Sequence, residues 1–214
     1  GILFGIVVSI CPAGAAPVLR GGRLHTFHEE NVLGTSFELK VQAASAEAAA
    51  QAEAAALAEV ARESRILSSW DGESEFSRWF RTRHQAVPVS PELFDVLARF
   101  DRWRTETGGA LDAAAEAVTR VWQAAARENR APSDAEISNA VAAIRQTHWQ
   151  LDAQARTATH LTDTPLALNS FVKSYIMDRA MNTVLATAGV TGALLNVGGD
   201  LVIRGEWTEP VNIV

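Results

Sequence analysis

The chain has 214 residues, of which 48% are hydrophobic, so it can bury one sizeable core and is predicted to form a single domain. Its formal net charge is −6 at pH 7 and it has no run of basic residues, which argues against nucleic acid or an anionic membrane surface as the main partner. The single cysteine, Cys11, excludes a disulfide framework and a cysteine cage for a metal, so any metal must be held by oxygen or histidine.

Residues 1–17 have the pattern of a secretory signal-peptide leader. An apolar run of about ten residues, too short to span a membrane as a helix, precedes the small residues Ala13 to Ala16. The chain lacks an initial methionine and a basic start, so we expect it to be a segment of a longer protein. That protein would be periplasmic or otherwise exported, with association to the inner membrane through the leader. A buried N-terminal strand is the alternative interpretation of these residues.

The next predicted elements are a strand and a helix. Residues Phe37–Ala43 alternate apolar and polar side chains, which is the period of a half-buried strand, and Leu33–Thr35 would form the turn before it. Residues Ala46–Leu67 are rich in alanine and carry apolar residues at helical spacing, so they predict a helix rather than disorder. A strand followed by a helix favours an α/β or α+β fold.

The following helix is marked at both of its ends. Ser90-Pro91 begins it, and Gly108-Gly109 ends it. Its apolar face includes Phe100 and Trp103, which we assign to the core rather than to a ligand platform.

The rest of the chain alternates between helical and strand patterns. The predicted elements are an alanine-rich segment after Asp112, a helix after the capping box Ser133–Glu136, short strands at His148–Asp152 and Ala158–Leu161, a helix over 169–188, and a hairpin of strands 194–197 and 201–204 that turns at Gly198–Asp200. The whole order predicts an α+β fold, a single compact domain with helices packed on a mostly antiparallel β-sheet.

The segment Thr107–Asp112 has two interpretations. It can be a helix end followed by an aspartate that caps the next helix, because glycine and aspartate occupy such corners for conformational reasons. Alternatively, its glycines can let backbone amides approach a ligand closely. The residues alone leave both open.

Lys173 lies among apolar residues of the last predicted helix, so its ammonium must reach solvent or meet an anion. If it meets an anion, phosphate is the natural candidate, because the predicted helix N-terminus at Asn169-Ser170 lies close by. Asp178 would lie on a different face and form an ion pair with Arg179 or with a neighbouring helix.

Several common catalytic patterns do not occur in the sequence. The histidines show no zinc-type pair at helical spacing, and there is no Gly-x-Ser-x-Gly elbow and no phosphate loop ending in Gly-Lys-Ser/Thr. These observations disfavour a histidine metal site and the common active-site arrangements of hydrolases and nucleotidases.

The order of several short blocks resembles the ApbE family of FAD:protein FMN transferases. The blocks are Leu33–Thr35, where the family has Met-Gly-Thr; Ser68–Glu75, similar to Ser-Thr-Tyr-x-x-x-Ser-Glu; Thr107–Asp112, similar to Ser-Gly-Gly-Ala-Phe-Asp; Trp122; Leu168 through Lys173 to Asp178; and Leu195–Asp200. The resemblance implies an ApbE-like domain over residues 24–214.

The resemblance also implies an activity and a site. Members of that family bind FAD beside Mg²⁺ and transfer the FMN half to a serine or threonine hydroxyl of another exported protein, releasing AMP. Carried over by position, the implied roles are Leu33 and Trp70 bordering the flavin, Ala110, Leu111 and Asp112 lining the nucleotide site, Lys173 facing the FAD phosphates, and Ser170 offering its backbone carbonyl to Mg²⁺. A cation at a diphosphate would neutralise charge that develops on the leaving phosphate.

The chain departs from the family pattern at specific positions. Ala167 stands where the family has an aspartate, and Asn169 and Ser174 replace two of its glycines. The family's later His-x-x-Asp-Pro region and acidic metal ligands would follow Val214, and we expect the catalytic residues there. The transferase activity is therefore expected of the parent protein rather than of these 214 residues alone. The alternative is a periplasmic protein that binds or hydrolyses FAD without transfer.

Overall fold

The computed structural model describes residues 22–207, 210 and 211. The predicted leader, residues 1–17, lies outside these described residues. Among the described helices, none has the length and apolar character needed to cross a membrane.

The larger sheet is antiparallel and has the strand order β1-β2-β6-β7. Its strands are β1 (Arg23–Val32), β2 (Thr35–Ala43), β6 (Val190–Val197) and β7 (Asp200–Gly205). The alternation in β2 turns Phe37, Leu39 and Val41 into the core, as the sequence predicts. The sequence pattern does not indicate β1, because it is an edge strand with mostly exposed residues and no clear apolar face.

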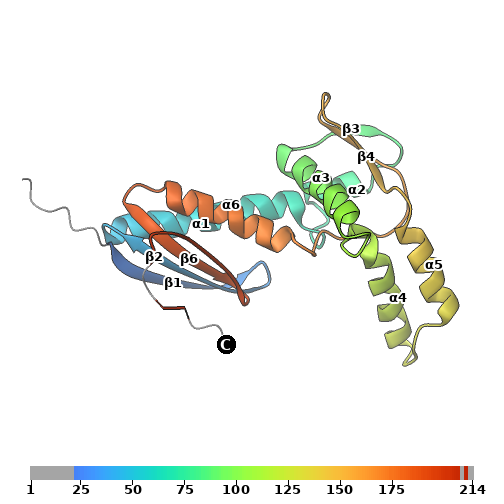
Figure 1. Cartoon of the computed structure of the whole chain (residues 1–214), viewed down its shortest axis with the longest axis horizontal. Coiled ribbons are helices and arrows are strands. Elements are labelled where there is room, and N and C mark those ends of the chain that lie inside the picture. The colour runs from blue at the N-terminus through green and yellow to red at the C-terminus, as the bar shows by residue number, and fades with distance from the viewer. Residues whose placement is uncertain (1–21, 208–209, 212–214) are drawn as a thin grey trace, which may run out of the picture.

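Two helices, α1 (Ala46–Leu67) and α6 (Val172–Ala186), lie side by side and cover one face of this sheet (Figure 1). Ser45 caps α1 through its side chain, and the buried alanines Ala49, Ala52 and Ala56 bring no bulk to the interface. The bounds of α1 agree with the prediction. Helix α6 is shorter than the predicted 169–188, because residues 169–171 form a turn before Val172.

The remaining elements form the other end of the molecule (Figure 1). They are α2 (Glu75–Phe80), β3 (Ala86–Pro88), α3 (Pro91–Glu106), the short 3-10 helix η1 (Ala113–Ala115), α4 (Glu116–Arg127), α5 (Asp134–Ile144), β4 (Trp149–Asp152) and β5 (Thr157–His160). Strands β3, β5 and β4 form a second antiparallel sheet. The α+β class and the antiparallel pairing are therefore confirmed, although the strands make two sheets rather than one.

The predicted capping residues begin α3 and α5 as expected. Ser90 caps α3 with Pro91 in its first turn, and Ser133 and Glu136 form the reciprocal capping box of α5. The prediction that Trp103 belongs to the core is wrong. It lies in the last turn of α3 at the rim of a cavity, and it is 40% exposed rather than part of the core.

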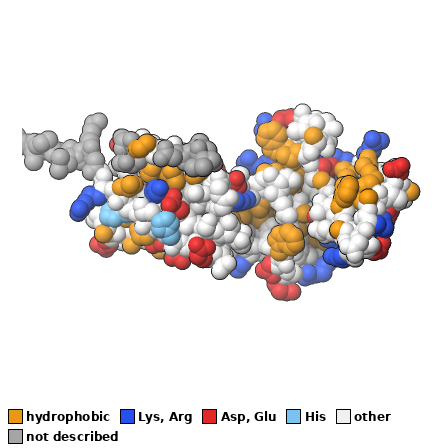
Figure 2. All heavy atoms as spheres, turned by 90° about the horizontal axis from the view of Figure 1, so that it is seen from below, with side chains coloured by type: hydrophobic (Ala, Val, Ile, Leu, Met, Phe, Trp, Pro, Cys, Tyr) orange, Lys and Arg blue, Asp and Glu red, His pale blue; other side chains and the backbone are white. Residues whose placement is uncertain are grey.

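Helices α4 and α5 form a hairpin that projects from the body of the molecule (Figure 1). Trp122 on α4 and Val141 on α5 remain exposed. Figure 2 shows apolar side chains exposed at this end of the molecule. The apolar residues of α4 and α5 thus contribute less to the core than their helical spacing alone would indicate.

Candidate functional site

A cavity of about 630 Å³ lies between the β1–β2 turn, the end of α1 and the start of α6. Leu33 comes from the turn, Trp70 from the loop after α1, and Lys173 from the first turn of α6. Three of the residues singled out from the sequence are therefore brought to one cavity by segments that are far apart in the chain. Its volume falls within the range of small-molecule sites.

The β1–β2 turn gives Leu33 an uncommon backbone conformation. Leu33 has φ 53° and Gly34 has φ 76°, both in the left-handed region. A Cβ on Gly198, in the β6–β7 turn, would lie 2.6 Å from the Thr35 hydroxyl oxygen, so the two turns pack directly against each other. The close approach requires a glycine and places both turns at the same end of the sheet.

Trp70 is the most exposed of the large hydrophobic side chains in the described part of the chain, with 84% of its surface accessible. Its loop is nevertheless well held, because the Ser68 hydroxyl accepts hydrogen bonds from the backbone amides of Trp70 and Asp71. The Ser69 hydroxyl accepts another from the Leu168 amide, at 3.0 Å. A planar aromatic group exposed on a fixed loop suits stacking against a flat ligand.

Lys173 forms an ion pair with a carboxylate of the same chain. Its ammonium nitrogen lies 3.0 Å from Oδ2 of Asp200, the first residue of β7. Both side chains keep partial contact with solvent, so a ligand anion can approach the same ammonium. The Gly-Gly-Asp turn thus contributes a carboxylate to the electrostatics of the cavity, which the sequence spacing did not indicate.

Two expectations for α6, one ion pair and the start of the helix, are corrected. Asp178 pairs with Arg204 of β7, not with Arg179 or with a neighbouring helix, because α6 lies on the sheet with Asp178 facing that strand. Helix α6 also begins at Val172 rather than at Asn169-Ser170. The first turn of the helix therefore lies closer to Lys173 than expected, and the amide of its first residue, Val172, donates to the Leu168 carbonyl.

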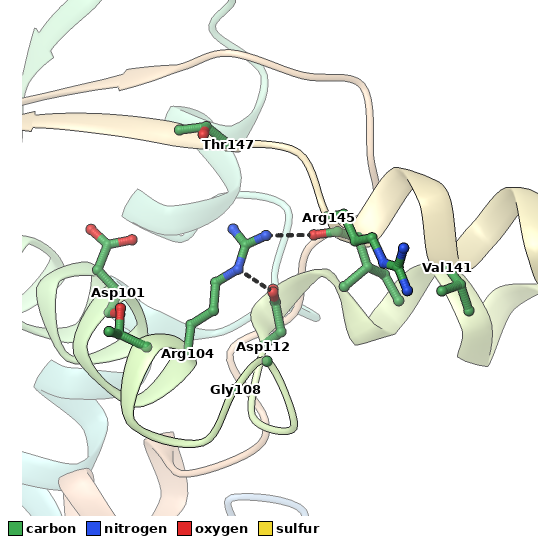
Figure 3. A pocket seen from close by; sticks show the side chains of 10 residues that line it. Asp101, Arg104, Gly108, Asp112, Val141, Arg145 and Thr147 are labelled. Atoms are coloured by element: carbon green, nitrogen blue, oxygen red, sulfur yellow. Dashed lines mark hydrogen bonds and ion pairs between the residues drawn. The ribbon is translucent and has the colours of Figure 1, made fainter.

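The loop Thr107–Asp112 does not line the cavity of Lys173. Leu111 lines a cavity of about 600 Å³ between α3 and α6, and Asp112 lines a third of about 900 Å³ between α3 and α5 (Figure 3). Ala110 is exposed on the same loop. The structure thus separates these three residues from Leu33, Trp70 and Lys173.

Asp112 has the capping role that the structural interpretation of this loop expects. It is almost fully buried, and its Oδ1 accepts a hydrogen bond from the Ala114 amide at the start of η1. Its Oδ2 lies 2.9 Å from Nε of Arg104. Gly108 and Gly109 have φ of 60° and 89°, as a helix end requires. A ligand role for this loop stays a prediction.

Ser170 is exposed in the turn before α6. A backbone carbonyl there could supply one oxygen ligand to a cation. Across residues 22–207, 210 and 211, no group of three or more His, Cys, Asp or Glu side chains is placed to hold a metal. A magnesium site with the Ser170 carbonyl as one ligand stays a prediction.

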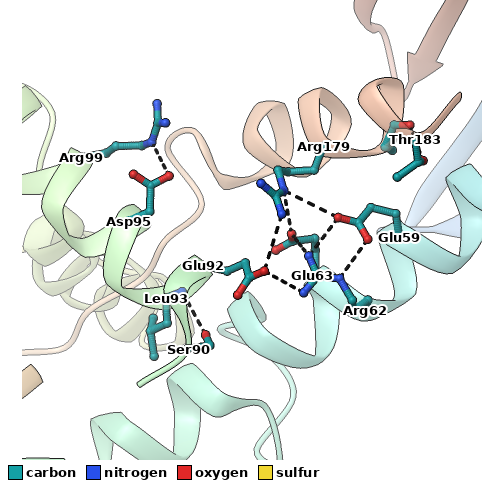
Figure 4. A network of polar contacts seen from close by, with 11 residues as sticks. Glu59, Arg62, Glu63, Ser90, Glu92, Leu93, Asp95, Arg99, Arg179 and Thr183 are labelled. Carbon is teal, nitrogen blue, oxygen red and sulfur yellow. Dashed lines mark hydrogen bonds and ion pairs between the residues drawn. The ribbon is translucent and has the colours of Figure 1, made fainter. Parts of the chain in front are cut away.

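Sequence reasoning missed a polar network behind the cavity wall (Figure 4). Arg62 on α1 pairs with Glu59, Glu63 and Glu92, and Arg179 on α6 approaches the same three carboxylates. Burial raises the pKa of Glu63 to about 6, against the lowering effect of the two arginines. The spacing of Glu59, Arg62 and Glu63 indicates pairing within α1, but no local signal predicts the link to α3 and α6.

The chain is similar to one family and to several solved structures. The sequence model of the ApbE family matches residues 33–213. The flavinyl transferase ApbE of Pseudomonas stutzeri, in its apo form, is 21% identical with a TM-score of 0.73, over 87% of this chain and 59% of that one. The flavin transferase ApbE of Vibrio cholerae is 19% identical with a TM-score of 0.71, over 86% and 60%.

The ApbE protein of Thermotoga maritima is 22% identical with a TM-score of 0.71, over 85% of this chain and 59% of that chain. The chain therefore spans about three fifths of the length of these structures, which share its fold. No curated protein sequence matches it.

Proposed function

The chain belongs to the ApbE family, and from this membership we propose that the complete protein transfers the FMN half of FAD to a serine or threonine hydroxyl of an acceptor flavoprotein, releasing AMP. The single observation that carries the proposal is the meeting of Leu33, Trp70 and Lys173 at one cavity. The flavin transferases of P. stutzeri and V. cholerae have the same fold, which supports the proposal.

The cavity offers the contacts that a flavin nucleotide needs. The exposed indole of Trp70 provides a face for the planar ring system, and Leu33 adds an apolar contact. Lys173 and the N-terminal amides of α6 provide positive potential for the diphosphate.

The proposal also gives a path to the loop Thr107–Asp112. The cavity of Leu111 contains Phe171 and Ser174, and the cavity of Trp70 contains Val172 and Lys173, so the two open on different sides of the start of α6. An FAD molecule that reaches both would lay its diphosphate across the N-terminus of α6. The flavin would lie on the Trp70 side and the AMP half on the side of the loop.

The transfer is a substitution at phosphorus. The acceptor hydroxyl oxygen forms a bond to the FMN phosphorus, the bond from that phosphorus to the bridging oxygen breaks, and AMP leaves with the bridging oxygen. The hydroxyl proton passes to a base. Lys173 would neutralise charge on the diphosphate as it builds up. Mg²⁺ dependence, with the Ser170 carbonyl as one ligand, rests on the family resemblance, and no step of the transfer is assigned to the metal.

Product analysis tests the proposal directly. The full-length protein is incubated with FAD and Mg²⁺, with and without a serine- or threonine-containing acceptor, and the products are separated by mass spectrometry. We expect the acceptor to gain the mass of FMN and AMP to appear in equal amount. Release of free FMN and AMP without acceptor modification would instead identify an FAD hydrolase. Retention of unchanged FAD would identify a binding protein, consistent with Ala167 in place of the family's aspartate.

We further propose that the protein acts outside the cytoplasm, because residues 1–17 have the pattern of a secretory leader. Fusing these residues to a reporter enzyme that is active only after export should give an active reporter. An inactive reporter, with the fusion retained in the cytoplasm, would contradict this part of the proposal.

A further inference from the structure

Arg104, in the last turn of α3, holds three segments at once (Figure 3). Its Nε lies 2.9 Å from Oδ2 of Asp112. Its two terminal nitrogens donate hydrogen bonds to the backbone carbonyls of Gln146 and Ile144, each at 2.9 Å. The planar guanidinium therefore joins the end of α3, the residue that ends the loop Thr107–Asp112, and the end of α5.

The pairing with Asp112 is what allows that carboxylate to be buried. Oδ1 accepts the capping hydrogen bond of η1, whereas Oδ2 has no hydrogen bond within the described residues and lies 2.9 Å from Nε of Arg104, its ion-pair partner. A buried carboxylate without a cation is strongly unfavourable. If an uncharged residue replaced Arg104, Asp112 would have to move towards water, and the loop would move with it.

The other end of the same loop is tied to the backbone of Arg104. The Gly109 amide donates a hydrogen bond to the Arg104 carbonyl at 2.8 Å, and the Leu111 amide donates to the Thr107 hydroxyl at 3.0 Å. Arg104 thus fixes the loop through its main chain at Gly109 and through its side chain at Asp112. Ala110 and Leu111 lie between these two attachments.

We propose that Arg104 is a positioning residue that sets the shape of the loop Thr107–Asp112 and thereby the affinity for the AMP half of FAD. The link to FAD rests on the proposed function, which places that half on the side of α6 where this loop and Leu111 lie. Arg104 itself acts through the loop and does not touch the nucleotide. Lysine cannot replace it fully, because one ammonium cannot keep the carboxylate and both carbonyls in the geometry of a planar guanidinium.

The test compares two variants with a matched control in the full-length protein. Arg104→Met keeps the aliphatic stem and removes all three contacts, and Arg104→Lys keeps the charge. Arg102→Met is the control, because Arg102 lies on the same helix and pairs with Glu106 within that helix. FAD affinity is measured by fluorescence titration below the unfolding temperature of every variant, and amide hydrogen exchange is followed over residues 107–114.

We expect Arg104→Met to bind FAD about tenfold more weakly or worse, with Arg104→Lys in between and Arg102→Met unchanged. Amide exchange over the loop should accelerate in the same order. In the transfer assay, KM for FAD should rise while kcat recovers at saturating FAD. A merely destabilised protein would instead lose kcat in proportion to its folded fraction.

Two results would overturn the role of Arg104: FAD affinity in Arg104→Met equal to that of the wild type, or weaker affinity with no change in loop exchange. If Arg104→Met does not fold, the same readouts in Arg104→Lys decide the outcome. Should the wild type bind no FAD, the proposed function fails. Amide hydrogen exchange over the loop then tests the role of Arg104 separately. Equal exchange rates in Arg104→Met and the wild type would contradict a positioning role for Arg104.

Discussion

Lys173 and Asp200 lie 3.0 Å apart at the cavity, and each partly offsets the charge of the other. A phosphate that approaches Lys173 must share the ammonium with this carboxylate or displace it. Lys173 therefore contributes to ligand binding only if its interaction with phosphate exceeds the one with Asp200. This balance makes it the residue whose substitution tests the site most directly.

Lys173→Met should weaken FAD binding, because a charge-assisted hydrogen bond contributes about 1.5–3 kcal/mol, or roughly ten- to a hundredfold in affinity. Isothermal titration calorimetry on the full-length protein measures the change. Lys40→Met is the matched control, since the other lysine of the chain lies on the opposite face of the sheet and pairs with Glu38. Unchanged affinity in Lys173→Met would remove this residue from the site.

Trp70→Ala should weaken FAD binding with little effect on the free energy of unfolding, because an exposed indole contributes little to the core. The lost stacking corresponds to about 0.5–1.5 kcal/mol. Trp70→Tyr should retain most of the affinity, since it keeps an aromatic face. Equal FAD affinity in the alanine and tyrosine variants would show that stacking at this position does not contribute.

At the scale of elements, the network of Glu59, Arg62, Glu63, Glu92 and Arg179 joins three helices (Figure 4). Glu63 is fully buried, and its second carboxylate oxygen has no hydrogen bond within the described residues. The arginines hold α3 and α6 against α1, which carries part of the cavity wall. The network thus supports the cavity of Leu33, Trp70 and Lys173, although Glu63 itself does not line that cavity.

Glu63 should make the protein less stable as the pH rises. Its pKa of about 6 lies above its ordinary value of 4.5, so the fold favours the protonated form. That stabilisation is complete below about pH 4.5 and is lost as the pH rises through about 6, a difference of about 2 kcal/mol. Glu63→Gln should remove this slope in urea unfolding measured across the same range.

Comparing the pH dependence of stability in the wild type and in Glu63→Gln separates the contribution of Glu63 from that of the groups around it. The charged or titratable groups facing it are Arg62 and Glu59 on α1, Glu92 on α3, and Arg179 and Tyr175 on α6. Hydrogen bonding with Arg62 lowers the pKa of Glu59, which is opposite in direction to the shift of Glu63. Identical pH slopes in Glu63→Gln and the wild type would rule out the assignment.

The small sheet should respond to pH in the opposite direction. His160 is the last residue of β5 and His148 directly precedes β4; both are buried, and burial lowers the pKa of both below the ordinary 6.5. The fold favours their neutral forms, so their contribution is complete above about pH 6.5 and is lost as the pH falls below it. The guanidinium of Arg83 lies beside Nδ1 of His160 and further lowers the pKa, because it disfavours a second positive charge, whereas the Phe80 carbonyl acts in the opposite direction.

His160→Asn should therefore reduce the loss of stability on acidification, even if the variant is less stable at neutral pH. Thermal unfolding followed from about pH 7.5 to 5 measures the two slopes. His28→Asn is a suitable control, because His28 lies exposed on β1 of the other sheet. An acid slope that His160→Asn leaves unchanged would speak against this origin.

At the scale of the whole molecule, the candidate site lies where the sheet with α1 and α6 meets the rest of the chain (Figure 1). The β1–β2 turn, the loop after α1 and the start of α6 each contribute one predicted residue. The loop Thr107–Asp112 reaches the other side of α6. A ligand that contacts all of them would bridge the two ends of the molecule, which is the arrangement that the proposed FAD path requires.

Much of the secondary structure was predictable because its causes are local. Apolar spacing and the Ser45 cap fix α1, the Ser133–Glu136 box fixes the start of α5, and the glycines after Thr107 end α3. Edge strand β1 was not predictable, since few of its residues are buried. In the second sheet, β4 and β5 were predicted as short strands, but β3 was not, because it has three residues and pairs with a strand about 70 positions away.

The sequence by itself determined the kind of fold, because the fold class follows from residue types at short spacing. Through the resemblance of its ordered blocks, it also led to a predicted set of flavin-nucleotide residues. Only the tertiary structure decided that Lys173 meets Asp200, that Arg104 holds Asp112, and that the predicted residues divide between the two sides of α6. These contacts join elements that no local pattern relates. Their distances depend on how the helices pack on the sheets and on each other.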